Sequence, residues 1–290
     1  MKQTGMNATC LQCHFSKNLE TALSLGDEAT AFRFAKDLMA LYLQAPEGVG
    51  SPWFGPGVTE LFQKYYGAGE DRYVQEKLDS NRFVMARFDE IQSLVARQED
   101  PVFAGLQFSI LGNYLDFSAL GKAVSFEKLD EMMEKALQME LDRDCYKKLC
   151  RDLEHGKKLL YLTDNAGELA FDRIFAQEIQ KKYPHLQITF CVRGGPVLND
   201  ATREDASAVG VPFPVIDSGN CIGGTELRCL GAEAKAAFES ADVIIAKGMG
   251  NNETLYGCGY NVYYAFLVKC KFFEQRFGKP LMTPMLVAER

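Results

Sequence analysis

The stretch KKLLYLTDNAGEL at residues 157–169 decides the fold class of the chain. Its short apolar run ends abruptly in Asp164 and Asn165, and Glu168 follows three residues later. An apolar run of this length is typical of a buried strand, and the helical pattern ELAFDRIFAQEIQKKY begins directly after it. A strand, a polar turn and a helix in this order predict one unit of a parallel sheet.

The same rhythm continues to the end of the sequence. Strand-length apolar runs recur in LQITFCVRG, FPVIDSG, DVIIAKG and YYAFLVKCK, and helical patterns separate most of them. Helices that connect parallel strands cover both faces of their sheet. We therefore expect an α/β fold for residues 151–290, with a Rossmann-like, mostly parallel sheet and helices on both faces.

Residues 1–150 follow a different, helical rhythm. Apolar residues recur every three or four positions over residues 27–44, 72–98 and 126–138, and residues 100–117 are apolar on nearly all sides, as in a buried helix. The segment at 46–58 is rich in Gly and Pro and predicts a loop. We expect an all-helical N-terminal part, residues 1–150, ahead of the α/β part.

Composition excludes several classes of protein. The formal charge of −7 argues against non-specific nucleic-acid binding, and no run of 18 apolar residues could span a membrane. The first residues lack the apolar core of a signal peptide. We expect a cytoplasmic protein with no nucleic-acid or membrane partner, and the sequence does not indicate its oligomeric state.

The nine cysteines are mostly scattered through apolar stretches, where they serve as small buried side chains. Cys10 and Cys13 are the exception, because they form a CxxC motif followed by His14. Tetrahedral zinc takes four ligands and no second CxxC is present, and a redox CxxC normally follows a strand. A structural pair is favoured, and its role stays open.

Polar side chains follow three strands of the predicted sheet. They comprise Asp164 and Asn165 after the first strand, Arg193 and Asp200 after the second, and Lys247, Asn251 and Glu253 after the fourth. The carboxyl ends of parallel strands meet at one edge, where ligands of such sheets bind. We therefore expect the three groups to lie together.

The chemistry of these residues favours a metal and a phosphate group. Two carboxylates and one amide oxygen suit Mg²⁺ or Mn²⁺. Arg193 and Lys247 could hold an anion beside the metal, and neighbouring glycines would expose backbone N–H groups to it. Each residue alone has a simpler interpretation: Asp164 and Asp200 as helix caps, Lys247 as a solvated charge, and GMGNNE as a near miss to a dinucleotide fingerprint.

Four motifs together resemble the DUF89 family of metal-dependent damage-control phosphatases, which are related to ARMT1-like proteins. They are GNYLDF (112–117), TDNAGE (163–168), RGGPVLNDAT (193–202) and AKGMGNNETL (246–255). The resemblance covers almost the whole chain, and it is greatest to the compact stand-alone prokaryotic branch, in which an N-terminal CxxC also recurs.

The resemblance implies a role for each matching residue. Metal ligands would be Asp164, Asn165 and Asp200, holding Mn, Ni, Co or Mg. Asp164 and Lys247 would be the catalytic residues, and Lys247 would contact the phosphate. The pocket for the substrate and its phosphate would include Arg193, Asn251, Glu253, Asn113, Asp116 and Glu168. Two alternatives stay open: Asn113 could satisfy a helix end, and Glu168 could orient a metal-bound water or cap its helix.

The implied activity is hydrolysis of a small phosphomonoester, such as a sugar phosphate or a damaged phosphometabolite, by water or through an aspartyl-phosphate on Asp164. The loops at 46–58 and 218–225 are candidate walls of the pocket. One rival is an S-adenosylmethionine-dependent carboxyl methyltransferase, although the first turn lacks the expected glycines and the second strand ends in Arg193. Another rival is a non-catalytic phosphometabolite-binding protein.

Overall fold

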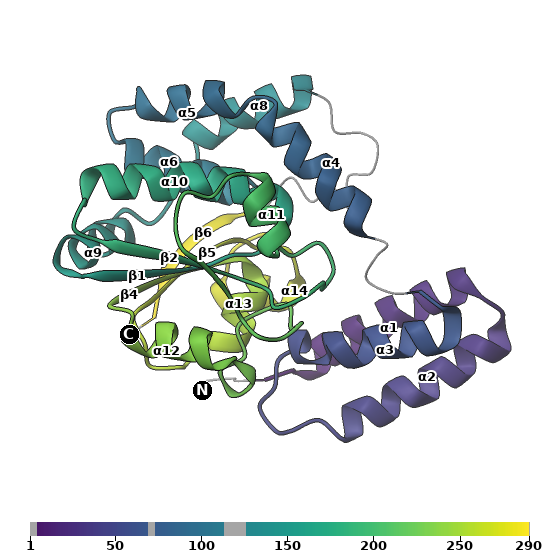
Figure 1. Cartoon of the computed structure of the whole chain (residues 1–290). Helices are drawn as coiled ribbons and strands as arrows, with labels where there is room; N and C mark the ends of the chain where they lie inside the picture. The colour runs from purple at the N-terminus through teal and green to yellow at the C-terminus, as the bar shows by residue number, and fades with distance from the viewer. Residues whose placement is uncertain (1–4, 69–72, 113–125, 290) are drawn as a thin grey trace.

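The computed structural model of the chain describes residues 5–68, 73–112 and 126–289. The N-terminal elements are α1 (Ala8–Leu25), α2 (Glu28–Leu43), the 3₁₀ helix η1 (Ser51–Phe54), α3 (Gly55–Tyr66), α4 (Val74–Met85), α5 (Phe88–Ala96), α6 (Pro101–Gly112), α8 (Phe126–Leu137) and α9 (Arg143–His155) (Figure 1). The α/β elements are β1 (Lys158–Leu162), η4 (Ala166–Glu168), α10 (Leu169–Lys182), β2 (Gln187–Val192), α11 (Arg203–Ala208), β3 (Val215–Asp217), η5 (Leu227–Cys229), α12 (Ala232–Ser240), β4 (Val243–Lys247), α13 (Gly248–Leu255), β5 (Val262–Leu267), α14 (Lys271–Phe277) and β6 (Pro284–Ala288).

In the described residues, six strands form one sheet in the order β3-β2-β1-β4-β5-β6. Neighbours are parallel except β5 and β6, which pair antiparallel. The chain runs outward from β1 to β2 and β3 and then returns to the other side of β1 as β4. The prediction of a mostly parallel α/β sheet is confirmed, and β1 and β4 form the switch point at which such sheets bind ligands.

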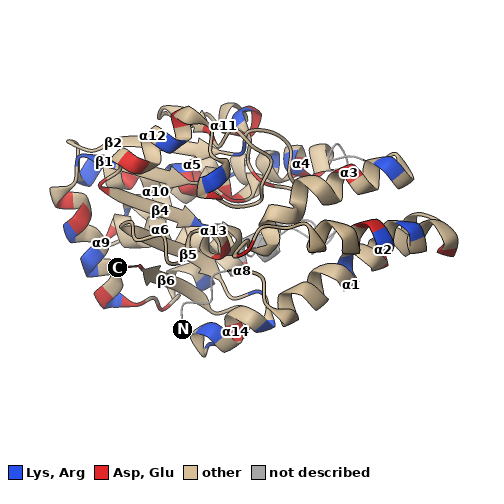
Figure 2. Cartoon of the chain, turned by 90° about the horizontal axis from the view of Figure 1, so that it is seen from below, with Lys and Arg blue, Asp and Glu red and all other residues tan. Residues whose placement is uncertain are grey.

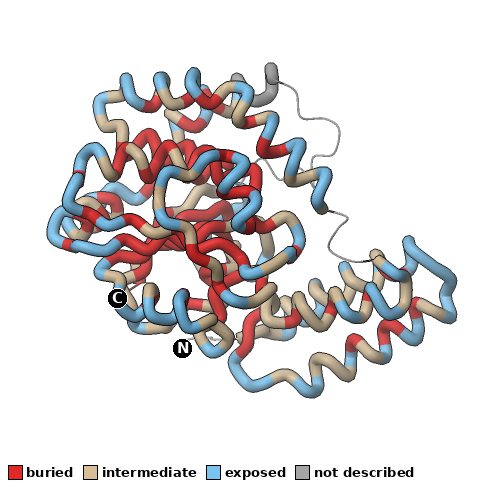
Figure 3. The backbone as a smooth tube through the Cα atoms, in the orientation of Figure 1, coloured by how far each residue is buried: buried red, intermediate tan, exposed pale blue. Residues whose placement is uncertain are grey.

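Helices cover both faces of the sheet, with α6 and α10 on one side and α12 and α13 on the other (Figure 1). The alternation of side chains along β4 shows how one strand serves both faces. Val243 and Ile245 belong to the apolar core on the α10 side, whereas Ile244 and Ala246 belong to the core on the α12 side. Both cores are visible as the buried interior in Figure 3.

The helix α6 is buried on nearly every side, as its apolar composition predicts. It packs along α10, and Gly105 lets the two backbones approach closely. A Cβ atom at position 105 would lie 3.0 Å from the Cα of Phe175. The helix is described as far as Gly112, so the remainder of the predicted segment at 100–117 lies outside the described residues.

The arm, which we define as residues 5–66, comprises α1, α2, η1 and α3 and projects from the sheet (Figures 1 and 2). Its buried apolar residues form a cluster of their own, between Ala22 and Phe62. The later helices α4 to α10 share their core with the sheet. The buried residues of the arm cluster end at Phe62 and those of the larger cluster begin at Val84. The predicted boundary at 150 stays a prediction.

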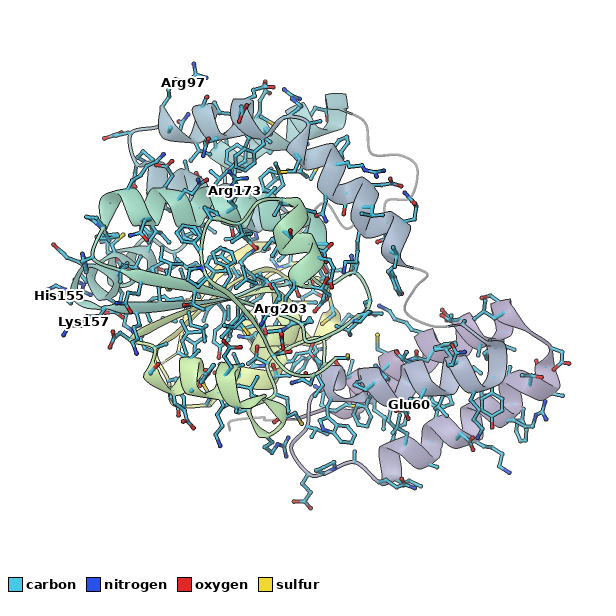
Figure 4. All side chains as sticks on the ribbon, viewed as in Figure 1. Glu60, Arg97, His155, Lys157, Arg173 and Arg203 are labelled. Carbon is cyan, nitrogen blue, oxygen red and sulfur yellow. The ribbon has the colours of Figure 1, made fainter. Side chains whose placement is uncertain are left out.

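The arm lies at the carboxyl end of the sheet. In Figure 4, Lys157, just before β1, lies at one extreme of the molecule, and Glu60 of α3 lies toward the other. The carboxyl ends of the strands therefore face the arm.

Within the described part of the chain, no helix has the length and apolar character needed to cross a membrane.

Candidate metal and phosphate site

The end of β1 is joined to the segment after β2. The N–H of Ala201 donates a hydrogen bond to the carbonyl oxygen of Asp164 at 2.8 Å. Asn165 and Asp200 form an isolated antiparallel bridge beside it. Asp164 and Asn165 thus meet Asp200, which is distant from them in sequence, at the carboxyl edge of the sheet.

The simpler interpretation of these residues as helix caps does not hold. The N-cap positions of η4 and α10 are held by Asn165 and Glu168, not by Asp164, and neither of these side chains makes a cap hydrogen bond. Thr202 caps α11 through a capping box, so Asp200 has no part in that cap. The carboxylates at the strand ends are therefore not explained by the start of the helices that follow them.

Gly248 brings the start of α13 against the carboxylate of Asp164. Its φ is +75°, and a Cβ atom there would lie 2.0 Å from Oδ2 of Asp164. A side chain at this position would be strained by the backbone conformation and would also collide with the carboxylate. The glycine is therefore required if Asp164 is to occupy the switch point between β1 and β4.

Arg193 links the carboxylates on the other side. Its Nε donates to Oδ2 of Asp200 at 2.6 Å, and Nη1 donates to the carbonyl oxygen of Gly224 at 2.9 Å. Its Nη2 lies 4.0 Å from Oδ1 of Asp164 and is buried without a hydrogen-bond partner. This orphaned donor is consistent with a site that accepts an anion beside Asp164.

Lys247 is fully buried on the opposite, α10 side of the sheet. Its Nζ donates to Oε2 of Glu168 (2.7 Å), the carbonyl oxygen of Ser109 (2.8 Å) and Oδ1 of Asp172 (2.9 Å). Burial lowers the pKa of this ammonium group, but Asp172 and Glu168 outweigh burial and the net pKa is raised. Lys247 is therefore charged and held by three acceptors. Its direct contact with phosphate stays a prediction, and the three hydrogen bonds that already occupy its ammonium group argue against it.

Asn251 and Glu253 have different surroundings. Asn251 joins the strand ends, because its Nδ2 donates to the carbonyl oxygen of Thr163 (3.0 Å) and its Oδ1 accepts from Thr225 (2.8 Å). Glu253 accepts a hydrogen bond from Ser51 of the arm. Burial raises the pKa of Glu253. Asn251 thus belongs to the strand-end cluster, and Glu253 belongs to the contact with the arm.

Formal charge does not balance in this buried cluster. Four carboxylates against two cations leave a formal charge of −2 among the side chains joined here, which are Asp164, Glu168, Asp172, Asp200, Arg193 and Lys247. Buried charges that are not balanced are strongly unfavourable. Lys269, at the same edge, opposes part of this charge at Asp164, and a cation bound beside the carboxylates would offset the remainder.

The pKa values of the carboxyl groups reflect this imbalance. Burial raises the pKa of Asp164 well above its ordinary value, and the carboxylates of Glu168 and Asp200 raise it further. Burial also raises the pKa of Asp200 although Arg193 opposes it. These groups therefore favour either a proton or another cation beside them.

The donor atoms fit a hard or intermediate divalent ion. Asp164, Asn165 and Asp200 offer oxygen atoms, which Mg²⁺ and Mn²⁺ prefer. Among the described side chains, no three His, Cys, Asp or Glu residues are grouped so as to hold a metal. The set Asp164, Asn165 and Asp200 contains only two carboxylates, and its third member is an amide, so it is not a group of that kind.

Cys10 and Cys13 lie in the first turns of α1 as free thiols. Burial raises the pKa of Cys10 to about 11, which is opposite to the lowered pKa of a reactive cysteine. A zinc site is not supported either, because no group of metal-binding side chains in the described residues includes this pair. The structural interpretation of Cys10 and Cys13 stays a prediction.

Sequence reasoning overlooked several members of the cluster. Asp172 lies one helical turn after Glu168 on an otherwise apolar helix face, and that isolated charge was a usable signal. Lys269 follows β5 at the same edge, and its charge opposes the rise in the pKa of Asp164. Asn113 and Asp116, predicted to line the pocket, lie outside the described residues.

Comparison with known proteins gives one family. The family described as damage-control phosphatase ARMT1-like domain matches residues 6–283. A damage-control phosphatase of Pyrococcus horikoshii is 35% identical over 215 residues, which are 73% of this chain and 71% of that protein. A second damage-control phosphatase, from Archaeoglobus fulgidus, is 33% identical over 64% of each chain.

Two further relatives extend over nearly the whole chain. An uncharacterized protein of Methanocaldococcus jannaschii is 34% identical over 93% of this chain and 90% of its own length. The crystal structure of a DUF89 family protein from Pyrococcus horikoshii superimposes with a TM-score of 0.80 at 27% identity, covering 98% of this chain and 99% of that one.

Proposed function

The chain belongs to the ARMT1-like damage-control phosphatase family, and from that membership we propose that it hydrolyses small phosphate monoesters with a divalent metal ion. Relatives named damage-control phosphatases support phosphatase activity in general. The proposal of a metal site rests on one observation above all, the excess of carboxylates over cations among the buried side chains joined at the strand ends.

In this proposal Asp164, Asn165 and Asp200 hold the metal ion. Such an ion, when bound, neutralises charge that develops on the phosphoryl oxygens in the transition state. Arg193 has its Nη2 beside Asp164, where it can donate to a phosphate oxygen without losing its bonds to Asp200 and Gly224. The helix α13 begins at Gly248, beside the carboxylate of Asp164, and the start of a helix generally favours an anion.

We propose a small substrate, and the contact of the arm with α13 at the edge of the cluster supports this. A Cβ atom at Gly50 would lie 3.3 Å from the carbonyl oxygen of Glu253, and one at Gly55 would lie 3.8 Å from that of Cys221. The prediction of a loop at 46–58 is wrong from residue 51 onward, because η1 and the start of α3 lie there. The other predicted wall, 218–225, comes close to the cluster, since a Cβ atom at Gly223 would lie 4.0 Å from Oδ2 of Asp200, and this supports both segments as walls of the pocket. Sugar phosphates or damaged phosphometabolites are the substrate class that we propose.

The rival functions have less support. An S-adenosylmethionine site needs a glycine-rich turn after the first strand, whereas β1 is followed by Asp164 and Asn165. A non-catalytic phosphate-binding protein would have the same cluster, and only a measurement of phosphate release distinguishes it from an enzyme.

The test is metal-dependent phosphate release by protein that has been stripped with a chelator. Mg²⁺, Mn²⁺, Co²⁺ and Ni²⁺ are added back singly, with p-nitrophenyl phosphate and a panel of sugar phosphates as substrates. We expect activity with at least one metal, and a loss of at least about 100-fold in Asp164→Ala, since transition-state charge stabilisation typically contributes that much.

Asp217→Ala is the matched control. Asp217 also ends a strand, β3, but its carboxylate pairs with Arg203 at 2.7 Å and accepts from the N–H of Gly219 at 3.0 Å, and neither partner belongs to the cluster. We expect this variant to keep wild-type activity. Folded wild-type protein that releases no phosphate with any metal would contradict the proposed function and favour a binding protein.

The attacking group requires a separate experiment. Either a water molecule or the carboxylate of Asp164 attacks phosphorus, and the alcohol leaves with a proton in both cases. An aspartyl-phosphate would accumulate radiolabel on the protein after rapid acid quenching, whereas attack by water leaves the protein unlabelled.

A further inference from the structure

The buried contacts of Glu168 lead from Lys247 to a proposed metal ligand. One oxygen of Glu168, Oε2, accepts from Nζ of Lys247 at 2.7 Å. The other oxygen, Oε1, accepts from Nδ2 of Asn165 at 2.6 Å. Glu168 is only 1% exposed, so water does not compete for these contacts. A continuous chain of hydrogen bonds, Lys247–Glu168–Asn165, therefore runs from the end of β4 to the end of β1, and we call it the relay.

The relay determines which way the Asn165 amide faces. A carboxylate only accepts hydrogen bonds, so the amide nitrogen of Asn165 must face Glu168. The same nitrogen lies 3.4 Å from Oδ2 of Asp164. The reversed amide would bring two oxygen atoms together in a buried site. The carbonyl oxygen Oδ1 of Asn165 is therefore directed away from Glu168, and only that atom of the amide can bind a cation.

Asp172 fixes the other end of the relay. Its Oδ1 accepts from Ser109 Oγ (2.7 Å), Tyr161 Oη (2.8 Å) and Lys247 Nζ (2.9 Å). Ser109 of α6 and Tyr161 of β1 therefore hold the carboxylate that accepts from the ammonium group of Lys247. Lys247 lies between two carboxylates, and one of them holds Asn165.

We propose that Lys247, anchored by Asp172, holds Glu168 so that Asn165 presents its carbonyl oxygen to the divalent ion. Lys247 and Glu168 are then positioning residues and not phosphate ligands. This inference rests on the proposed function, because it concerns the same metal site. It also accounts for a full charge on a lysine that has no exposed surface.

The test is the affinity of metal-stripped protein for Mn²⁺, measured by calorimetry without substrate. We expect Glu168→Gln to bind Mn²⁺ about 10- to 100-fold more weakly, which is the usual effect of removing a group that orients a metal ligand. Gln matches Glu in size, but its amide group can accept the reversed Asn165. A role in folding alone would lower stability without changing the metal affinity of the folded protein.

Glu178→Gln is the matched control. Glu178 is also a buried glutamate of the same segment, 5% exposed and paired with a lysine, Lys181, but it lies at the far end of α10. We expect this variant to bind Mn²⁺ as wild type does. Equal Mn²⁺ affinity in Glu168→Gln and Glu178→Gln would overturn the positioning role.

Lys247→Met distinguishes a positioning role from contact with phosphate. We expect it to lose Mn²⁺ affinity as Glu168→Gln does, and to keep wild-type inhibition by inorganic phosphate once saturated with Mn²⁺. Unchanged Mn²⁺ affinity with weakened phosphate inhibition would make Lys247 a phosphate ligand and overturn the inference. If Lys247→Met does not fold, the Mn²⁺ affinity of Glu168→Gln alone decides whether the relay positions Asn165.

The two proposals fail in different ways. Wild-type protein that binds no divalent metal would contradict the proposed function, and the positioning role would fall with it. Wild-type protein that binds Mn²⁺ and is active, with Glu168→Gln equal to it in Mn²⁺ affinity, would overturn only the positioning role.

Discussion

At the scale of single residues, the candidate site depends on a backbone position as much as on its carboxylates. Gly248 follows β4 with φ +75°, and the carboxylate of Asp164 occupies the space where a side chain would begin. The sequence motif AKGMGNNETL therefore includes a glycine for a steric reason. The strand end can approach β1 only because position 248 has no Cβ atom.

Gly248→Ala should abolish the site while leaving most of the fold intact. The added Cβ atom would lie 2.0 Å from Oδ2 of Asp164, so the carboxylate must move. We expect phosphate release to fall at least about 100-fold, in line with the loss of a group that stabilises transition-state charge. Steady-state kinetics measure the loss of phosphate release, and Mn²⁺ titration of the stripped protein measures the loss of metal binding.

The comparison variant is Gly259→Ala. Gly259 has a similar φ of +82°, but a Cβ atom there meets nothing within 4 Å. Both variants carry a backbone penalty of about 1–2 kcal/mol, and only Gly248→Ala has the collision. If the two variants proved equally active, the contact between position 248 and Asp164 would have no functional importance.

The residues of the cluster were predictable to different degrees. Asp164, Asn165 and Asp200 follow strands, and the rule for parallel sheets brings such residues together without further information. The surroundings of Lys247 were harder to predict. Side chains alternate along β4, so Lys247 must share a face with Val243 and Ile245. Sequence alone does not say that Glu168 and Asp172 of the neighbouring layer would enclose it there.

At the scale of elements, the N-terminal helices show where sequence patterns are least informative. The helical rhythm of residues 72–98 is continuous, yet α4 ends at Met85 and α5 begins at Phe88. Neither Gly nor Pro marks this break, so no local signal predicts it. By contrast, Asp27 accepts a hydrogen bond from the N–H of Thr30 at the start of α2, as a helix cap should.

His14 makes the stability of the arm sensitive to pH. Its Nδ1 lies 2.6 Å from the hydroxyl of Tyr42, and burial lowers the pKa of His14 from 6.5 to about 4, with Lys17 adding to the effect. Between these two values the unfolded arm binds more protons than the folded arm. The contribution of His14 is therefore complete above pH 6.5 and is lost as pH falls toward 4.

We expect His14→Gln to remove this part of the pH dependence. At about 1.4 kcal/mol per pKa unit the loss in wild type is at most about 3–4 kcal/mol, and it is smaller than that because the ring is not fully enclosed. Urea unfolding at several pH values, followed by the fluorescence of Trp53, reports on the arm because Trp53 is the single tryptophan and packs on Phe54. Identical pH profiles for the two proteins would show that His14 is not protonated on unfolding.

Acidic groups of the arm do not obscure this comparison. Asp27 and Asp37 also have lowered pKa values, through hydrogen bonds from Thr30 and Lys64 respectively. Their contributions are likewise lost as pH falls, but in a lower range and equally in both proteins. The difference between wild type and His14→Gln therefore isolates the imidazole.

At the scale of the whole molecule, the chain contains apolar cores of unequal extent. The cores on the two faces of the sheet share its strands, whereas the core of the arm lies within residues 22–62. Contacts between the arm and the α/β part include the hydrogen bond from Ser51 to Glu253 and the approach of Gly50 to the same residue. A small core with few outside contacts opens at a lower free energy than a large one.

Hydrogen exchange should therefore divide the molecule at the arm. We expect the buried amides of α1, α2 and α3 to exchange together, through an opening that leaves β1 and β4 protected, because those strands lie at the centre of the sheet. Mn²⁺ with inorganic phosphate at about 100 times its dissociation constant should slow exchange by up to about 100-fold in segments whose opening disrupts the site. The segments that contact the site from each side are η1 and α13, so they should respond most, and the outer helix α9 should respond least. If α1 to α3 were as protected as β1 and β4, the arm would be part of one cooperative unit, and a substrate would have to enter the site without its opening.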